Sequence, residues 1–487
     1  MSTTQLIRSE WPAFRRSGRL IALAAAGLIV IAVGLQFASG NRSGCDGPCR
    51  QLVSYDDTVV RDQFSFLHRD LGREGGITVR LTSMTGTITY PPPNHDQIVP
   101  GLVPWAKAGI VIKDGVRPGS RYAALMMTGG HGVRFQYDYT HDVAGRGGDV
   151  SQQSPRWLRL TRSGDNITGA ESTDGRQWHT VASAKLDGLP DNVQVGLFAT
   201  SPNNLTLRKA GLGGAMGQER HTQAVGVFDN VTLDGAAAGA WHSEPVGGAS
   251  TADWEKRNPS RAVEKDGVIT VSGSGDIGPS GDEGVKALLL GLPIGLIIVL
   301  IVAAHYGAAL EAPSRRVIDA RTIVVAAATF VTGLVAVGIV VPAGMAILKG
   351  NGILVPVPML TGARVVTGLA VVLALCGIPA FGLGLRLRRG WTANLIGLSL
   401  IALPYTVATL PLLPDPVSEW LLRLTPAAGF AVQQTMTEYP QVTAHYAPSA
   451  GYFPLPWWAG LAVLGAYTVI VMWIAVGRKP VADTDWR

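Results

Sequence analysis

Six long apolar segments constrain this chain more than any other feature, because each is long enough to cross a lipid bilayer as a helix. A crossing needs about 20 apolar residues, and backbone groups in hydrocarbon must be satisfied within the helix itself. The low charged fraction of 16% and the mean hydropathy of +0.23 fit a membrane protein. The segments are 20–38, 287–307, 322–347, 364–385, 392–412 and 456–477. We therefore predict a six-helix α transmembrane bundle.

Basic residues lie at alternate ends of these segments, and such residues mark the cytoplasmic side of a membrane protein. They are Arg8, Arg15, Arg16, Arg19, Arg315, Arg316, Arg321, Arg386, Arg388, Arg389, Arg478, Lys479 and Arg487. The pattern predicts a multi-pass protein of the plasma (inner) membrane with both termini cytoplasmic, including a tail at 479–487. Residues 39–285 and 413–455 are then outside. The net charge of +6 reflects this anchoring and does not indicate nucleic acid.

The first 39 residues could instead be a cleaved signal peptide. The apolar run of about 19 residues is long for a signal sequence, and Phe37-Ala38-Ser39 is a poor cleavage site. We favour a retained first helix at 19–38. Residues 1–18 before it predict an interfacial amphipathic helix on the lipid bilayer. Its apolar residues Leu6, Ile7, Trp11 and Phe14 share one side, and its arginines face the lipid head groups.

The region 39–285 is polar and glycine-rich, and its core at 55–235 alternates polar and apolar residues with turn signals between the runs. This pattern predicts a large extracytoplasmic antiparallel β-sandwich. The predicted strands are 76–84, 106–114, 121–129, 133–139, 156–164, 178–186, 193–200 and 226–233. Residues 236–285 are expected to form a small β segment and a hinge that returns the chain to the membrane.

This order of motifs, from FSFLHRDLGREGGITVRLTSM through RWLRLTRSGDNITG to VQVGLFATSP and FDNVTL, resembles the concanavalin A-like, laminin-G-type jelly roll. The resemblance covers 60–235, and it implies the fold and carbohydrate binding rather than catalysis. The aromatic candidates for glycan contact are Tyr137, Tyr139, Trp157 and Trp178. The alternative is that these side chains fill the core of the sandwich or its rim.

Other chemistry has weaker support in this region. Glycoside hydrolysis needs two facing carboxylates, and no short pattern pairs the candidates Asp138, Asp142, Asp149 and Glu171. The histidines show no spacing typical of a metal site. Cys45 and Cys49 frame the stretch CDGPC on the predicted outer side, which favours a disulfide.

The stretch SGSGDIGPSGDEG (272–284) is glycine-rich and precedes a helix, as a phosphate-binding loop does. It does not match G-x-x-x-x-G-K-[ST], the spacing that brings backbone N–H groups and a lysine onto phosphates. We interpret it as the hinge before the second membrane helix, kept in water by its acidic residues. Ionisable groups of the kind usual at depth in ion-coupled carriers are nearly absent from the apolar segments, in which Arg364 and His305 lie only at the ends. Any energy source would therefore belong to another chain.

The whole layout resembles the type-2 ABC exporter permeases, particularly the actinobacterial ones. The resemblance rests on LIRSEWPAFRRSGR, SGSGDIGP, GIPAFGLGLRLRRGWTANLIGLSLIALP and WLLRLTPAAGFAVQQTMTEYP with PWWAGLAVLGAYTVIVMW. It implies five further membrane helices at 286–478 with an outer re-entrant segment at 413–455. It also implies a cytoplasmic ABC ATPase partner that binds the ATP, and a homodimer or a heterodimer with a second permease. The chain itself would not be an enzyme and would hold no cofactor.

In that family, the stretch corresponding to 305–322 contacts the ATPase. Its polar residues Glu311, Arg315, Arg316 and Asp319 are the candidates for coupling, although the stretch is shorter and less charged than is usual. Two alternatives remain open. One is a non-transporting relative of the permeases, and the other is a membrane-anchored sugar-binding or envelope-interaction protein.

Overall fold

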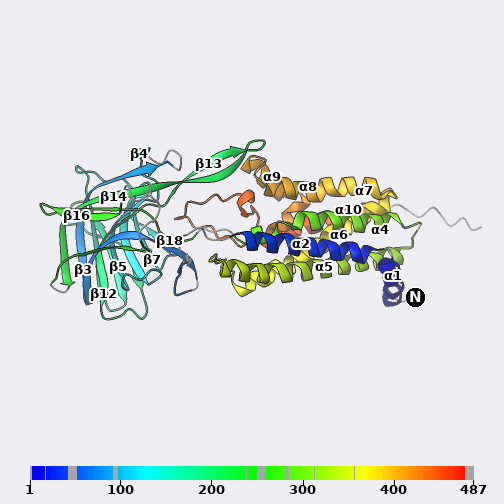
Figure 1. The fold of residues 1–487 in the computed structure, drawn as a ribbon, viewed down its shortest axis with the longest axis horizontal. Coiled ribbons are helices and arrows are strands. Elements are labelled where there is room, and N and C mark those ends of the chain that lie inside the picture. Colours follow the sequence, from blue (N-terminus) through cyan, green and yellow to red (C-terminus); the bar gives the residue numbers. More distant parts are fainter. Residues whose placement is uncertain are drawn as a thin grey trace, which may run out of the picture.

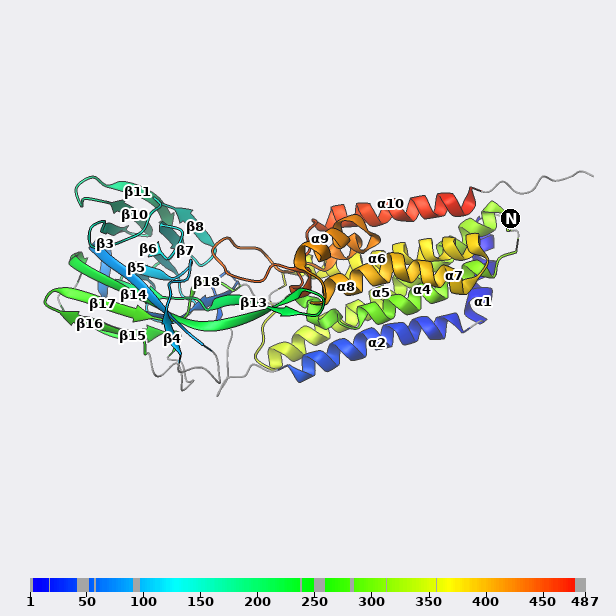
Figure 2. The same cartoon turned by 90° about the horizontal axis from the view of Figure 1, so that it is seen from above.

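The computed structural model describes residues 3–16, 18–41, 52–56, 58–90, 97–236, 239–248, 259–280, 284–311, 313–355 and 357–477. A β domain forms one end of an elongated molecule and a bundle of parallel and antiparallel helices forms the other (Figure 1). Helix α1 (Thr3–Arg16) lies across the far end of the bundle, away from the β domain (Figures 1 and 2). We refer to the two ends of the bundle as the α1 end and the β-domain end.

Five helical stretches are long and apolar enough to cross a membrane, as the hydropathy of the sequence predicted. They are α2 (Arg19–Gly40), α5 (Arg315–Gly350), α6 (Met359–Leu387), the continuous run Gly390–Thr409 and α10 (Trp457–Val476). The predicted segment 287–307 forms a shorter apolar helix, α4 (Leu292–Ala308), preceded by the short turn η1 (Val285–Leu289).

Glycines let α4 pack closely against α6 near the α1 end. A Cβ added at Gly307 would collide with the Phe381 carbonyl, and one added at Gly384 would collide with the Ala304 carbonyl. Small residues that permit such backbone approach are a common means of packing membrane helices. Helices α4 and α6 are therefore tightly packed near the α1 end.

The helices in the last third of the bundle sequence are interrupted by non-α-helical segments. The run Gly390–Thr409 contains a π turn, η2 (Leu398–Ala402), between α7 (Gly390–Gly397) and α8 (Leu403–Thr409). After it come α9 (Asp415–Leu424), the 3-10 segment η3 (Pro426–Gln433), in which every residue is buried, and the short η4 (Pro448–Ala450). A long irregular stretch between η3 and α10 reaches toward the β domain (Figure 2).

The β domain is built on one large antiparallel sheet with the strand order β11-β10-β9-β3-β12-β5-β6-β7-β8. Strand β3 (Phe64–Thr89) pairs with β12 through its first part and with β9 through its second part. The sheet therefore folds over itself into two layers, whereas the sequence led us to expect two separate sheets. The further strands of this path are β5 (Lys107–Lys113), β6 (Tyr122–Thr128), β7 (Val133–Tyr137), β8 (His141–Ala144), β9 (Arg156–Ser163), β10 (Asn166–Ser172), β11 (His179–Lys185) and β12 (Val193–Thr200).

Each predicted strand overlaps an observed strand, and where it extends beyond that strand it does so by one or two residues. Burial alternates along β9, whereas every residue of β5 and β6 is buried. Apolar residues from both layers, such as Ile110, Leu125, Leu158 and Leu197, form one core. Strand β14 (Gly214–Ala236) pairs with β3 and with β17 (Val268–Gly273) and extends the sheet. The remaining strands on it are β4 (Ile98–Pro100), β13 (Asn204–Ala210), β15 (His242–Val246) and β16 (Arg261–Lys265).

A second sheet of three short strands joins the β domain to the bundle. Strand β2 (Val59–Asp62) lies between β1 (Leu52–Val53) and β18 (Ile277–Pro279). Strand β2 follows α2 along the chain and β18 precedes α4, so the strands that lead into and out of the β domain pair with each other. This arrangement forms a two-stranded stem.

Part of the predicted hinge belongs to this stem. Asp276 is buried and forms an ion pair with the buried Lys107, with 2.5 Å between Oδ1 and Nζ. Our interpretation that the acidic residues of 272–284 stay in water is therefore wrong for Asp276, because a cation inside the domain neutralises it. Residues 281–283, which contain the other two acidic residues of the stretch, lie outside the described residues.

Strands β13 and β14 also form a hairpin arm that the sequence analysis did not predict. The arm extends from the β domain to the bundle beside α9 (Figure 2). At its tip, the Leu212 backbone N–H donates a 2.7 Å hydrogen bond to the Leu412 carbonyl. The β domain and the bundle are thus connected by the arm as well as by the stem.

Candidate functional site

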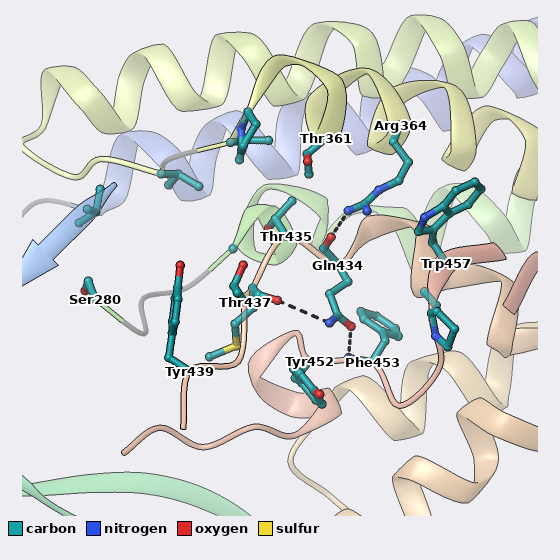
Figure 3. A pocket seen from close by; sticks show the side chains of 18 of the residues that line it. Ser280, Thr361, Arg364, Gln434, Thr435, Thr437, Tyr439, Tyr452, Phe453 and Trp457 are labelled. Carbon is teal, nitrogen blue, oxygen red and sulfur yellow. Dashed lines mark hydrogen bonds between the residues drawn. The ribbon is translucent and has the colours of Figure 1, made fainter. Parts of the chain in front are cut away.

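A cavity of about 990 Å³ lies where the bundle meets the β domain. Small-molecule sites typically have volumes of about 300–1,000 Å³. The walls come from four separate parts of the chain, which are the start of β2, the exit from β18, the start of α6 and the stretch from η3 to α10 (Figure 3). The lining residues are Asp56, Thr58, Val59, Ser280, Gly284, Val355, Val357, Pro358, Thr361, Arg364, Ala431, Gln434, Thr435, Met436, Thr437, Tyr439, Tyr452, Phe453, Pro454, Leu455, Pro456 and Trp457.

Arg364 is the only basic residue that lines this cavity within the described part of the chain. It stands in the second turn of α6, and its Nη2 donates to the Gln434 carbonyl (Figure 3). Its Nε is buried and has no hydrogen-bond partner in the described part of the chain. A charged group in a membrane helix is costly to bury, and such groups usually face a cavity or a substrate path. Arg364 is therefore the strongest candidate for a ligand contact.

Gln434 and Thr435 hold one wall of the cavity in place. The Gln434 Oε1 accepts a 2.7 Å hydrogen bond from the Phe453 backbone N–H, which joins the two sides of the irregular stretch (Figure 3). The Thr435 Oγ1 accepts a 3.0 Å hydrogen bond from the Val285 backbone N–H at the start of η1. The stretch that lines the cavity is thus fastened to the point where the chain leaves the β domain.

Lys286 fastens the same region from the other side. Its Nζ donates to the carbonyl of Ser449 and, at 3.0 Å, to the carbonyl of Thr409 at the end of α8. The lysine therefore satisfies carbonyl groups at the end of a helix, where no intrahelical donor is available. Its charge is used in the scaffold of the site.

Two tyrosines, Tyr439 and Tyr452, line the cavity. The Tyr452 hydroxyl donates a 2.6 Å hydrogen bond to Glu438, and this bond together with burial raises the pKa of Tyr452 to about 12. Burial and the nearby Asp56 also raise the pKa of Tyr439. Both side chains therefore remain neutral hydroxyl groups over the physiological pH range, able to donate hydrogen bonds.

The α1 end of the bundle holds a second polar cluster, which joins four helices. Arg321 of α5 donates from Nε to Glu10 of α1 at 2.7 Å. The guanidinium groups of Arg19 and Arg321 lie 4.6 and 4.7 Å from the ring centre of Tyr306 in α4. Phe14 of α1 packs edge-on against the same ring at 5.0 Å and is buried. We call these five residues the α1 clamp.

The sequence analysis predicted that α1 is amphipathic but did not identify the partners that hold it. Phe14 is buried as expected, whereas Trp11 is 40% exposed. The pairing of Glu10 with Arg321 joins residues more than 300 positions apart, and no local pattern indicates it. The arginines of 1–18 that can be placed, Arg8 and Arg15, are exposed.

The predicted coupling residues Glu311, Arg315, Arg316 and Asp319 are all exposed at the α1 end. They do not form a separate helix, because α4 ends at Ala308 and α5 begins at Arg315. Arg315, Arg316 and Asp319 lie on the first turns of α5. The connection is therefore a short link followed by the exposed start of a long helix.

The four aromatic candidates for glycan contact do not form one site. Tyr139 is buried, and its hydroxyl donates a 2.7 Å hydrogen bond to Asp62 beneath the three-stranded sheet. Tyr137 packs against the core of the domain and stacks on His141 with ring centres 4.3 Å apart. Tyr139 is therefore a core residue and Tyr137 lies at the rim of the core, as the alternative interpretation of the sequence has it.

Trp157 and Trp178 lie on the outer side of the layer that contains β9 and are partly exposed. The Arg80 guanidinium lies 5.8 Å from the ring centre of Trp157, and the Arg159 guanidinium lies 3.7 Å from that of Trp178. Arginine thus covers part of each indole face. These two tryptophans share one surface, separate from Tyr137 and Tyr139.

The three-stranded sheet covers one face of the β domain through buried ion pairs. Lys113 of β5 lies 2.7 Å from Asp62 of β2, and neither side chain is exposed. The Lys113 Nζ also donates to the Ser120 carbonyl at 3.0 Å. Burial lowers the pKa of Lys113, and the Asp62 carboxylate opposes that shift. The stem is thus fixed to the sheet beneath it.

The acidic residues that were considered for glycoside hydrolysis have different surroundings. Asp142 and Glu171 each form an ion pair with an arginine, and Asp149 is exposed. Asp138 is buried, which raises its pKa. In the described part of the chain, no group of three or more His, Cys, Asp or Glu could hold a metal ion. The predicted disulfide between Cys45 and Cys49 lies outside the described residues.

Comparisons with known proteins identify no family. No protein-family model matches the chain, and no curated protein matches its sequence. Among solved structures, a protein of unknown function from Saccharomyces cerevisiae is 17% identical with a TM-score of 0.22, over 39% of this chain and 85% of that one. Scytalido-glutamic peptidase is 6% identical with a TM-score of 0.27, over 44% and 98%. A GH43 protein of Bacillus licheniformis is 14% identical with a TM-score of 0.21, over 34% and 28%. Similarities this low indicate neither an activity nor a ligand.

Proposed function

We propose that this chain is the membrane-spanning subunit of an ATP-driven exporter of the type-2 ABC class, powered by a separate cytoplasmic ATPase. The observation that carries the proposal is the contrast along the bundle. At the α1 end, the α1 clamp joins four helices and the charged link is exposed, while the β-domain end contains a large cavity. A force applied to the link would act directly on α5, which also contacts α1, α2 and α6.

In this proposal, α4 is a sixth crossing, both termini are cytoplasmic and the β domain is extracytoplasmic with a jelly-roll fold. A homodimer, or a heterodimer with a second permease, would form the transport pathway. The interruption of the last third of the bundle supports this function. Non-helical backbone at membrane depth is tolerated only where protein buries it or where it lines a cavity.

Co-expression with cytoplasmic ABC ATPases of the same organism, chosen by their Walker motifs, tests the proposal. We expect the two proteins to copurify and the chain to stimulate ATP hydrolysis. The double variant Arg315→Glu/Arg316→Glu should abolish this stimulation, because it reverses the charge of the exposed start of α5. The matched control Arg388→Glu/Arg389→Glu reverses two exposed arginines at the same end, after α6, and should retain it. An ATPase that neither copurifies nor responds would contradict the proposal.

A second candidate function, glycan binding by the β domain, is favoured only by the shared surface of Trp157 and Trp178. The full-length protein on a glycan array tests it. Binding that is lost in Trp178→Ala but kept in Tyr137→Ala would support a site on that surface. If no glycan is retained, this candidate is excluded.

A further inference from the structure

We infer that the cavity between the bundle and the β domain binds an amphiphile with an anionic, phosphate-type head group, and that Arg364 contacts that head group. The inference deepens the proposed function and rests on it for only one point, the identification of this ligand class with the exported cargo. Binding itself can be tested without transport. Three features of the cavity carry the inference, namely its position, its unpaired donor and its mixed lining.

The position of the cavity puts it at the boundary between hydrocarbon and water. Two of its lining residues, Pro358 and Trp457, stand at the starts of α6 and α10. The neighbouring Met359, Leu360 and Trp458 are 91%, 86% and 62% exposed. Large apolar side chains exposed together at the end of membrane helices face lipid, and tryptophan favours the head-group level. A lipid-like molecule can therefore approach the cavity from the side.

The donor inside the cavity determines the charge of the ligand. Arg364 donates to a backbone carbonyl through Nη2 and leaves its Nε buried without a partner in the described part of the chain. A guanidinium carries five N–H donors in a planar fork that suits phosphate and carboxylate oxygens. Among the described residues, no carboxylate is paired with Arg364, because the acidic residue that lines the cavity, Asp56, is exposed and accepts hydrogen bonds from its own turn. The cavity therefore favours an anion at the Arg364 side.

The rest of the lining suits a molecule with a polar and an apolar part. Thr361, Thr435 and Tyr439 also line the cavity and contribute hydroxyl groups to it (Figure 3). Apolar surface is provided by valine, proline and aromatic side chains on the same walls. A wholly hydrophilic anion would leave this apolar surface wet, and a wholly apolar molecule would leave the arginine unpaired. An anionic amphiphile satisfies both parts of the lining.

The test uses the purified full-length chain in nanodiscs of phosphatidylcholine, without nucleotide or ATPase. The probe is phosphatidylglycerol with a fluorescent acyl chain, displaced by unlabelled phosphatidylglycerol, phosphatidylcholine or glycerol 1-phosphate. We expect phosphatidylglycerol to compete at least about 10-fold better than phosphatidylcholine, because only its net charge complements the arginine. Since no ATPase is present, failure of this assay is distinct from failure of the exporter proposal.

Variants assign the binding to the cavity. Arg364→Gln should weaken probe binding by about 10-fold or more, and Arg364→Lys should retain much of the preference for the anionic lipid. The control Arg423→Gln removes an arginine that is paired with Glu419 at 3.0 Å on exposed α9, and it should have no effect. Thr361→Trp fills the cavity from the half-exposed first turn of α6 and should abolish binding even if Arg364→Gln fails to fold.

Two outcomes would overturn the inference. Equal competition by phosphatidylglycerol and phosphatidylcholine would show that Arg364 does not distinguish an anionic head group from a zwitterionic one. Displacement by glycerol 1-phosphate as effective as displacement by phosphatidylglycerol would show that the cavity takes a water-soluble anion instead of an amphiphile.

Discussion

The two ends of the helix bundle each contain an arginine beside aromatic side chains, but the surroundings of the two arginines differ. Arg321 at the α1 end is paired with Glu10 and lies against Tyr306. Arg364 at the β-domain end has no carboxylate partner among the described residues and borders a cavity of about 990 Å³. The first arginine joins helices at its end of the bundle, and the second remains available to a ligand. The comparison shows that the same residue type serves structure or binding according to its neighbours.

The difference has a physical cause in the backbone. At the α1 end, glycines allow α4 and α6 to approach until the backbone of one helix contacts the backbone of the other. At the β-domain end, α8 ends early and the irregular stretch after η3 is inserted between the helices and the stem. Irregular backbone needs local hydrogen-bond partners and cannot pack as closely as helix on helix. The large cavity lies at that end.

The largest expected effect concerns the stem, which supports the wall of the cavity on the β-domain side. Lys113→Met leaves the buried Asp62 carboxylate without its cation, which costs about 3–5 kcal/mol. In a domain of this size the loss should lower the thermal unfolding midpoint of the β domain by roughly 10 °C. Circular dichroism of the full-length chain at β-sheet wavelengths measures the midpoint.

Two controls separate this buried pair from ordinary surface charges. The double variant Asp62→Leu/Lys113→Met removes both charges together and should recover most of the loss. Arg73→Met removes an arginine from an exposed pair with Asp191, at 61% and 82% exposure, and should cost less than about 1 kcal/mol. If Lys113→Met is as stable as Arg73→Met, the stem is not held by this pair.

Acid should also act on the β-domain end. Burial lowers the pKa of His221, at the base of the arm in β14, from 6.5 to about 4. The unfolded chain therefore binds a proton near pH 6.5 that the folded chain resists until about pH 4. Stability is full above pH 6.5 and falls as the pH drops toward 4, by up to about 3 kcal/mol.

Unfolding titrations between pH 4 and 8 test this prediction. His221→Gln should flatten the pH dependence below pH 6.5, because glutamine does not titrate. His179→Gln, at an exposed position on β11, is the matched control and should leave the curve unchanged. Parallel curves for the wild type and His221→Gln would show that another group carries the acid sensitivity.

A smaller effect is expected at the α1 end. Glu10 and Arg321 are each 16% exposed at their side chains, so their pairing should contribute about 1–2 kcal/mol. A double-mutant cycle of Glu10→Gln and Arg321→Gln, with unfolding followed in detergent, measures the coupling. Additive single losses would show that the α1 clamp depends on the aromatic packing of Phe14 and Tyr306 and not on the ion pair.

The sequence was sufficient to predict the elements of both ends but not their different chemistry. Hydropathy marks helices such as α5 and α10 because a bilayer requires unbroken apolar runs, and strict alternation marks strands such as β9. The cavity was not predicted, because its walls combine residues near positions 56, 280, 360 and 435. Arg364 could only be identified as a residue near the end of a helix.

Local patterns also misplaced individual side chains. Tyr139 was a candidate surface aromatic, yet it adopts a positive φ of 65° after β7 and points under the stem. The arm was missed because no residue of β13 is buried and its polar composition resembles that of a loop. In both cases the deciding partner is distant in sequence, as Asp62 is for Tyr139 and Leu412 is for the tip of the arm.

The contact of the arm with the bundle gives the smallest and most local prediction. A Cβ added at Gly214 would collide with the backbone of Pro411, so Gly214→Val should displace the arm from the α8–α9 connection. Hydrogen–deuterium exchange should rise in residues 204–220 and 410–414 by a factor of about 10, a local loss near 1.4 kcal/mol, without a change elsewhere. The matched control Gly217→Ala lies in the same strand, where the nearest contact is the flexible end of Leu205 at 3.3 Å, and it should exchange as the wild type does. If Gly214→Val changes exchange around the cavity as well, the arm helps to shape the binding site, and the difference between the two ends of the bundle depends on the β domain.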